Sequence, residues 1–257
     1  MTLTPLPALT DNYIWMLHDG HQALVVDPGE AAPVRAALQA QSLQLVAILV
    51  THHHADHTAG IQALKEATGA VVWGPALESI GGVDHLLEDG ADCLALGYRF
   101  QVMHIPGHTA GHIAYYTAPD DGSPPLLFCG DTLFSAGCGR LFEGTPQQML
   151  GSLLRLAALP ANTRVCCTHE YTLSNLRFAR AVEPDNSTLA EYEVRCLSRR
   201  AGGLPTLPSS IGLELAINPF LRSHLTPIAT AAARHDAPLV AQAGVFAALR
   251  EWKNNYR

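Results

Sequence analysis

Apolar and polar residues alternate in short blocks along the first two-thirds of the chain, and these blocks predict strands separated by turns and short helices. The stretch from Ala23 to Asp27 is compactly apolar and ends at a Pro-Gly pair. The stretch from Leu43 to Val50 is almost continuously apolar, which is typical of a strand buried on both faces. Similar blocks predict strands at residues 71–73, 100–105, 113–117, 126–129 and 163–167.

The pattern becomes mostly helical after about residue 170. One helical stripe contains Leu189, Tyr192, Cys196 and Leu197, and the Gly-Gly pair at 202–203 is expected to end that helix. A last helix is expected over residues 239–254. We therefore predict a sheet-containing domain over residues 1–170 and a smaller all-helical domain over residues 171–257. The alternation of strands and helices alone also fits a doubly wound parallel sheet.

Composition narrows the class of protein. The chain of 257 residues is 48% hydrophobic and 15% charged, so it can bury a large core. Its net charge of -7 and its lack of a basic run argue against a nucleic-acid partner. No apolar run approaches the ~18 residues that span a bilayer, no signal peptide is visible, and no C-x-x-C pair marks a disulfide framework. We expect a cytoplasmic monomer without a membrane partner.

The run from Thr51 to His57 (THHHADH) directly follows the buried strand and carries the most specific chemistry. Neutral imidazoles and a carboxylate are the ligands expected for zinc, iron or manganese. In extended backbone, His52 and His54 point the same way and can share one ion. Asp56 and His57 then fall on a turn aimed at a neighbouring position. This short run therefore predicts parts of two metal sites.

Three further candidate ligands follow other predicted strands: His108, Asp131 and His169. Each comes after an apolar stretch and adjoins Gly, Pro or Thr, as a loop ligand beyond a sheet would. The candidates then comprise five histidines and two aspartates. That set suffices for two ions with three terminal ligands each and Asp131 as a bridge.

The order of these motifs resembles the metallo-β-lactamase superfamily, and within it the glyoxalase II family of hydroxyacylglutathione hydrolases. The motifs are T-H-x-H-x-D-H at 51–57, P-G-H-T-x-G-H at 106–112, G-D-T-L-F at 130–134 and H-E-Y at 169–171. Shorter matches extend over essentially the whole chain: D-N-Y at 11–13, V-D-P at 26–28, G-C-G-R at 137–140, E-G-T at 143–145, V-E-P at 182–184, N-P-F-L-R at 218–222 and L-R-x-W-K at 249–253.

The resemblance implies an α+β fold, an αββα sandwich followed by a small all-α domain, with two divalent metal ions, zinc foremost and iron or manganese as alternatives. It implies that one ion is bound by His52, His54 and His108, the other by Asp56, His57 and His169, and that Asp131 bridges them.

The activity implied is hydrolysis of the thioester S-D-lactoylglutathione to D-lactate and glutathione, the second step of methylglyoxal detoxification. A hydroxide bridging the two ions would attack the thioester, with Asp56 and Asp131 acting through that hydroxide. The resemblance places the glutathione moiety against Arg140, Phe142, Tyr171, Arg250 and Lys253. The family commonly has a tyrosine where this chain has Phe142, so one hydroxyl hydrogen bond is lost.

The sequence leaves alternative functions open, and its other histidines have no expected role as ligands. A related hydrolase such as a lactonase, a mononuclear iron persulfide dioxygenase, and a non-enzymatic metal-binding protein all stay open, since fold alone does not separate them. His53 is expected to face away from the metals and His112 to give structural support. The remaining histidines are interpreted as surface or core residues: His18, His21, His85, His104, His224 and His235.

Overall fold

The computed structural model describes residues 1–119 and 122–256, and within them the chain forms two six-stranded sheets and a short β-hairpin. The first sheet has the order β1 (Thr2–Ala8), β2 (Asn12–His18), β3 (Gln22–Val26), β4 (Gln44–Leu49), β5 (Val71–Pro75) and β6 (His85–Leu87). The second has the order β14 (Ser209–Ser210), β13 (Arg164–Cys166), β10 (Leu126–Phe128), β9 (Ile113–Thr117), β8 (Tyr98–His104) and β7 (Asp92–Ala95). The hairpin pairs β11 (Leu133–Phe134) with β12 (Gly137–Cys138).

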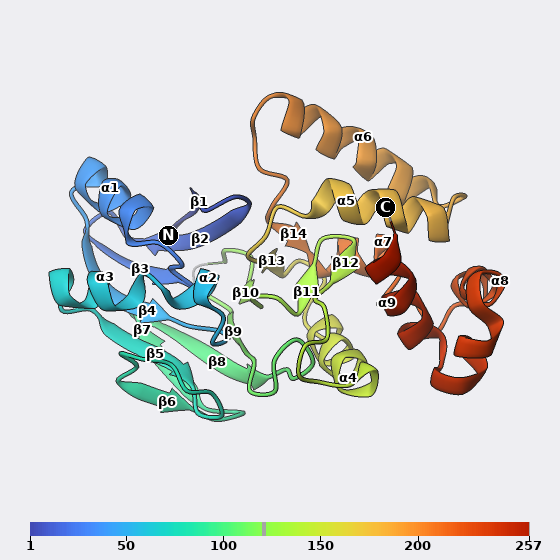
Figure 1. Ribbon diagram of the computed structural model, residues 1–257. Coiled ribbons are helices and arrows are strands. Elements are labelled where there is room, and N and C mark those ends of the chain that lie inside the picture. The colour runs from blue at the N-terminus through green and yellow to red at the C-terminus, as the bar shows by residue number, and fades with distance from the viewer. Residues whose placement is uncertain (120–121, 257) are drawn as a thin grey trace.

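The helices lie on the outer sides of the sheets and beyond them (Figure 1). They are α1 (Ala31–Gln41), α2 (Ala55–Thr58), α3 (Ile61–Thr68), α4 (Pro146–Ala157), α5 (Thr172–Val182), α6 (Ser187–Ala201), α7 (Ile211–Ile217), α8 (Thr226–Ala243) and α9 (Val245–Asn255).

The first sheet is buried on both faces because its side chains alternate between two apolar clusters. Trp15 of β2 packs into the cluster between the two sheets. Its neighbours Ile14 and Met16 pack on the other face, with Val34 of α1 and Leu64 of α3. On the far side, the cluster between the sheets continues into α4, α5 and α9. The αββα sandwich with a helical C-terminal part is therefore confirmed, and the doubly wound alternative is wrong. The C-terminal part is not all-helical, however, because its strand β14 pairs antiparallel with β13 at the edge of the second sheet.

The first two strands form an N-terminal hairpin that the apolar pattern does not predict. β1 pairs antiparallel with β2, from Thr2 opposite His18 to Ala8 opposite Asn12. β1 contains Pro5 and Pro7, which share one side of the strand because they are two residues apart. Proline has no N–H to donate and is tolerated on an edge strand, where that side faces away from the sheet. Because of these prolines, the sequence pattern does not indicate a strand at residues 2–8.

The strands deliver the site loops to one edge of the sandwich. β8 and β10 are both antiparallel to β9, and β13 is parallel to β10, so the carboxyl ends of β8, β10 and β13 share one edge. The first sheet meets this edge where the Ile113 N–H donates to the Thr51 carbonyl at 3.0 Å. The loops after β4, β8, β10 and β13 therefore converge, and they carry all the candidate ligands.

The C-terminal helices differ from the sequence prediction in two places. The helix predicted over 239–254 is in fact the end of α8 and the whole of α9, separated by Gly244 at φ 88°. Glycine adopts this backbone conformation without steric cost, so the helix breaks there. In α6, Leu189, Tyr192 and Cys196 are buried as predicted, but Leu197 is 52% exposed.

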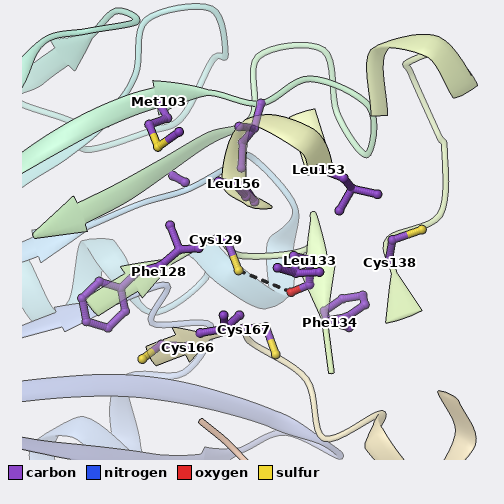
Figure 2. Close-up of a cluster of buried hydrophobic side chains, with 14 of the residues drawn as sticks. Met103, Phe128, Cys129, Leu133, Phe134, Cys138, Leu153, Leu156, Cys166 and Cys167 are labelled. Carbon is purple, nitrogen blue, oxygen red and sulfur yellow. Dashed lines mark hydrogen bonds between the residues drawn. The ribbon is translucent and has the colours of Figure 1, made fainter. Parts of the chain in front are cut away.

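All six cysteines are buried and free. Figure 2 shows Cys129, Cys166 and Cys167 among apolar side chains near the hairpin, with the Cys129 thiol 3.3 Å from the Leu133 carbonyl oxygen. They therefore act as small apolar core residues. Among the residues the structure describes, none of the helices has the length and apolar character needed to cross a membrane.

Candidate metal centre and its cavity

The loops beyond the strand ends bring the predicted ligands into two neighbouring groups. One group is His52, His54 and His108; the other is Asp56, His57 and His169. Within each group the donor atoms lie within 4.8 Å of one another. The short helix α2 separates the run into the two groups, since His54 stands at its N-cap and Asp56 and His57 lie inside it.

The first group has the spacing of a metal site. His54 Nδ1 lies 3.1 Å from His52 Nε2 and 3.0 Å from His108 Nε2. Tetrahedral zinc with Zn–N bonds of about 2.0–2.1 Å separates its ligand atoms by about 3.3–3.4 Å. Both distances are within about 0.4 Å of the edge of such a tetrahedron.

The second group has similar spacing, and Asp131 reaches both groups. Asp56 Oδ2 lies 3.5 Å from the Nε2 atoms of both His57 and His169. Asp131 Oδ1 lies 3.4 Å from His57 Nε2, and its Oδ2 lies 3.3 Å from His169 Nε2. The same Oδ2 is 3.5 Å from His108 Nε2 in the first group. Asp131 thus lies between the two groups.

Outer partners fix which ring nitrogen of each imidazole is free to bind a metal. His57 Nδ1 lies 3.0 Å from Asp27 Oδ2, and His169 Nδ1 lies 2.8 Å from Asp11 Oδ1. A carboxylate accepts hydrogen bonds and cannot donate them, so each Nδ1 carries a proton. Nε2 is then the atom of each ring that points into the site and can bind a metal, an arrangement typical of metal-binding histidines.

Outer partners orient two imidazoles of the first group in the same way. His108 Nδ1 donates to the Arg140 carbonyl at 2.9 Å. The Thr51 hydroxyl donates its one proton to Asp27 Oδ2 at 2.7 Å, so it accepts from His52 Nδ1 at 3.0 Å. His52 and His108 therefore also present bare Nε2 lone pairs to the site.

Buried atoms without partners show that a cation fits here. Among the described residues, His57 Nε2 and Asp131 Oδ1 are buried and have no hydrogen-bond partner. An unsatisfied buried polar group costs about 1–3 kcal/mol. Burial lowers the pKa of His57, but the Asp131 and Asp27 carboxylates outweigh it and raise that pKa well above its ordinary value. Burial alone raises the pKa of Asp131, but His57 and His169 hold it well below its usual range.

The imidazole and carboxylate donors, together with this demand for positive charge, fit divalent metal ions. Two further histidines of the motifs stand outside both groups. His53 Nε2 lies 2.7 Å from Glu143 Oε1, so its side chain turns away from the groups. His112 is fully buried, stacks on the His52 ring at 4.6 Å and accepts from the Asp131 backbone N–H at 3.2 Å.

Several residues that hold the ligands carried no chemical signal of their own in the sequence. Asp27 receives hydrogen bonds from the Thr51 backbone and hydroxyl as well as from His57. Asp11, in the turn between β1 and β2, and Asn12, the first residue of β2, contact the second group. In the sequence, these residues stand out only as members of the V-D-P and D-N-Y motifs. The pattern of apolar and polar residues gives them no chemical role.

Both groups open into one cavity of about 710 Å³. Its lining includes five of the candidate ligands, His54, Asp56, His108, Asp131 and His169, and all five residues predicted to bind glutathione, Arg140, Phe142, Tyr171, Arg250 and Lys253. The cavity therefore brings the two predicted parts of the site together.

The far end of the cavity is positively charged. Arg250 is buried, with only 5% of it exposed, and donates to the Cys138 carbonyl at 2.8 Å. Lys253 Nζ lies 3.3 Å from the carbonyl and hydroxyl oxygens of Ser174. Burial, with the charge of Arg250 next in size, lowers the pKa of Lys253 to about 8. Within residues 1–119 and 122–256, neither these cations nor Arg140 forms an ion pair with a carboxylate. This end therefore suits an anionic ligand.

Two aromatic side chains line the cavity beside the metal groups. The Phe142 ring is 63% exposed and lies 5.6 Å from the His54 ring and 5.2 Å from the His108 ring, centroid to centroid. The Tyr171 ring stacks on His169 at 4.6 Å and an interplanar angle of 3°. Each group therefore has an aromatic side chain next to it.

The sequence matches two family models. Residues 9–169 match the metallo-beta-lactamase superfamily, and residues 170–256 match the hydroxyacylglutathione hydrolase C-terminus. Among solved structures, ETHE1 from Myxococcus xanthus is 25% identical with a TM-score of 0.66, and the match covers 98% of both chains. TTHA1623 in a di-iron-bound form is 27% identical with a TM-score of 0.59, over 86% of this chain and 100% of that one. The chain therefore has the fold of the metallo-β-lactamase superfamily.

Curated relatives narrow the class further. A hydroxyacylglutathione hydrolase of Albidiferax ferrireducens is 60% identical over 256 residues, covering 100% of both chains. A hydroxyacylglutathione hydrolase of Pseudomonas aeruginosa is 56% identical and covers 98% of both chains. The chain therefore belongs to the hydroxyacylglutathione hydrolase family.

Proposed function

We propose that this protein hydrolyses S-D-lactoylglutathione to D-lactate and glutathione. The observation that carries the proposal is the single cavity, which joins two donor groups for divalent ions to a cluster of cations without carboxylate partners in the described residues. Glutathione is a tripeptide with two carboxylates, and a thioester to its sulfur holds the reactive carbonyl at a distance from both. A site for this substrate therefore needs a cation end and a hydrolytic end.

We assign one ion to His52, His54 and His108, the second to Asp56, His57 and His169, and the bridging position to Asp131. Zinc is the first candidate for these ligands, and iron and manganese are the alternatives. Two divalent ions held there would supply Lewis-acid chemistry: they would lower the pKa of a bound water towards about 7 and polarise a thioester carbonyl. The related TTHA1623 was solved in a di-iron-bound form, which supports a binuclear site.

The residues of the chain position the substrate and set the charge around it. Arg140, Arg250 and Lys253 bind the glutathione carboxylates, which leaves the thioester directed towards the donor groups at the other end of the cavity. We accordingly divide the chain into a catalytic domain over residues 1–170 and a glutathione-binding domain over residues 171–257, which contributes Tyr171, Arg250 and Lys253. The two cationic side chains of α9 are what the helical part adds to the chemistry.

A protein nucleophile has no place in this reaction. Cys138 lines the cavity, but burial raises the pKa of its thiol, so it stays protonated at neutral pH. The glutathione sulfur leaves as a thiolate, which is stable enough to depart without a general acid. We assign to Asp56 and Asp131, the two carboxylates among the proposed ligands, the role of orienting the attacking water.

The test is an assay of the metal-loaded protein on three substrates: S-D-lactoylglutathione, a simple lactone and glutathione persulfide. The expected result is fast hydrolysis of the thioester, weak or no hydrolysis of the lactone, and no oxygen consumption with the persulfide. The protein stripped of metal by a chelator is the control and should be inactive. Oxygen consumption with the persulfide, or preference for the lactone, would assign the protein to another activity of the superfamily. Hydrolysis of neither ester would refute the proposal.

A further inference from the structure

The D-N-Y motif at residues 11–13 comprises the last residue of the turn between β1 and β2 and the first two residues of β2, and it lies against the second donor group. Asp11 Oδ1 accepts from His169 Nδ1 at 2.8 Å. The Asn12 side-chain N–H donates to Asp56 at 3.2 Å to Oδ2 and 3.3 Å to the carbonyl. Two consecutive residues thus hold two of the three ligands in that group.

The turn is fixed by backbone and side-chain contacts on both sides. The Tyr13 N–H donates to the Thr168 carbonyl at 2.6 Å, and the Glu170 N–H donates to the Asp11 carbonyl at 2.8 Å. The Tyr13 hydroxyl donates to Glu170 Oε2 at 2.9 Å. These bonds clamp the turn to the residues on either side of His169. These bonds therefore restrain the positions of the Asp11 and Asn12 side chains.

The supports of the first group come from elsewhere. His52 is held by Thr51, and His108 by the backbone carbonyl of Arg140. Asp27 binds Thr51 as well as His57, so it acts on both groups. Of these supports in the described part of the chain, only Asp11 and Asn12 contact ligands of the second group alone.

We propose that Asp11 and Asn12 are positioning residues that set the affinity of the second ion and leave the first ion unaffected. This inference rests on the proposed assignment of Asp56, His57 and His169 to one ion. Asp11 keeps the proton on His169 Nδ1 and makes Nε2 a stronger donor to metal. The Asp56 side chain is 41% exposed, so its orientation depends on the hydrogen bond from Asn12.

The experiment measures two zinc dissociation constants per chain by competition with a chromophoric chelator. It compares wild type with Asp11→Ala, Asp11→Asn and Asn12→Ala. Loss of such an outer partner typically weakens metal binding by about 10- to 100-fold. We expect a change of that size in one of the two constants for Asp11→Ala and Asn12→Ala, with the other constant within about twofold of wild type. Asp11→Asn keeps an acceptor oxygen for His169 and should recover part of the loss.

The matched control is Glu30→Ala. Glu30 Oε2 accepts from the Leu9 N–H at 2.6 Å, so it holds the same turn without contacting a ligand. The control should keep both constants. Equal weakening of both ions, an equal effect of Glu30→Ala, or unchanged constants in Asp11→Ala and Asn12→Ala would each overturn the inference. A wild type that binds fewer than two ions would instead refute the proposed binuclear site, so the two failures are distinguishable.

Discussion

The two ends of the cavity are built differently. At the metal end, four imidazoles are each oriented by an outer acceptor, and Asp131 lies between the two groups. At the cation end, Arg250 and Lys253 donate mainly to backbone and hydroxyl oxygens and have no carboxylate partner in the described part of the chain. At the metal end, the side chains are held in place before a substrate binds. At the cation end, positive charges remain that an anionic substrate can neutralise.

The difference predicts two kinds of mutational effect. On the proposed function, the ligands at the metal end take part in every step of the chemistry, so their loss should abolish activity. The proposed role of the cations at the other end is to hold parts of the substrate that do not react, so their loss should weaken binding uniformly and leave the chemical step intact. The following variants test that distinction, beginning with the strongest effect.

Asp131→Ala should have the largest effect. The Asp131 carboxylate approaches ligands of both groups, so its removal should release bound metal. We expect kcat to fall by at least about 10³-fold, which is the upper end of the range for loss of one stabilising group. Metal content by mass spectrometry and thioester hydrolysis measure the result, and circular dichroism shows that the chain still folds. His53→Ala, a change in the same histidine run but outside both groups, should keep metal and activity. Full metal content in Asp131→Ala would contradict the bridging role.

The sequence predicts the metal end well because its ligands follow strands closely. His52 comes three residues after β4 ends at Leu49, so a local pattern finds both strand and ligand. The outer partners are a different case. His169 and Asp11 are 158 positions apart and meet only because the N-terminal hairpin pairs into the first sheet. A strand with two prolines gives no local sign of that pairing.

The cation end was predictable by resemblance and not by pattern. Arg250 and Lys253 are three positions apart on α9, which places them on one face of a helix in any fold. Their meeting with Arg140 depends on how α9 packs against the hairpin at Cys138. α9 itself begins only after the break at Gly244, which the apolar pattern does not reveal.

Arg250→Ala should raise KM by about 10- to 100-fold, since a hydrogen bond to a charged group contributes about 1.5–3 kcal/mol. Its kcat should stay within about threefold, which steady-state kinetics on S-D-lactoylglutathione measures. Arg195→Ala is the control, because Arg195 is an exposed arginine on α6 that packs on Tyr192 outside the cavity lining. A fall in kcat with KM unmoved would mean that Arg250 belongs with the metal end.

The affinity for glutathione derivatives should fall as the pH rises through about 8. The pKa of Lys253 is lowered from 10.5 to about 8, so its side chain is charged below that pH and neutral above it. Loss of one cation should weaken inhibition by S-methylglutathione by about three- to tenfold, the size of a modest charge interaction. Lys253→Met should bind weakly at pH 7 and lose this pH dependence. An unchanged profile in Lys253→Met would exclude Lys253 as its source.

Phe142→Tyr should have the smallest effect and tests the boundary between the two ends. Phe142 packs on His54 and His108, yet most of its ring faces the cavity. A hydroxyl added to the ring supplies one hydrogen bond to the ligand, worth about 0.5–1.5 kcal/mol, and should lower KM by about two- to tenfold at constant kcat.

Phe142→Leu separates the ring from the hydroxyl in the same kinetic assay. It keeps an apolar side chain but removes the aromatic contacts with the two imidazoles. If Phe142→Tyr lowers KM while Phe142→Leu leaves metal affinity unchanged, the side chain serves the substrate end. If KM does not respond to the hydroxyl and Phe142→Leu weakens metal binding, the ring acts by packing the first donor group. In that case Phe142 belongs with the metal end of the cavity.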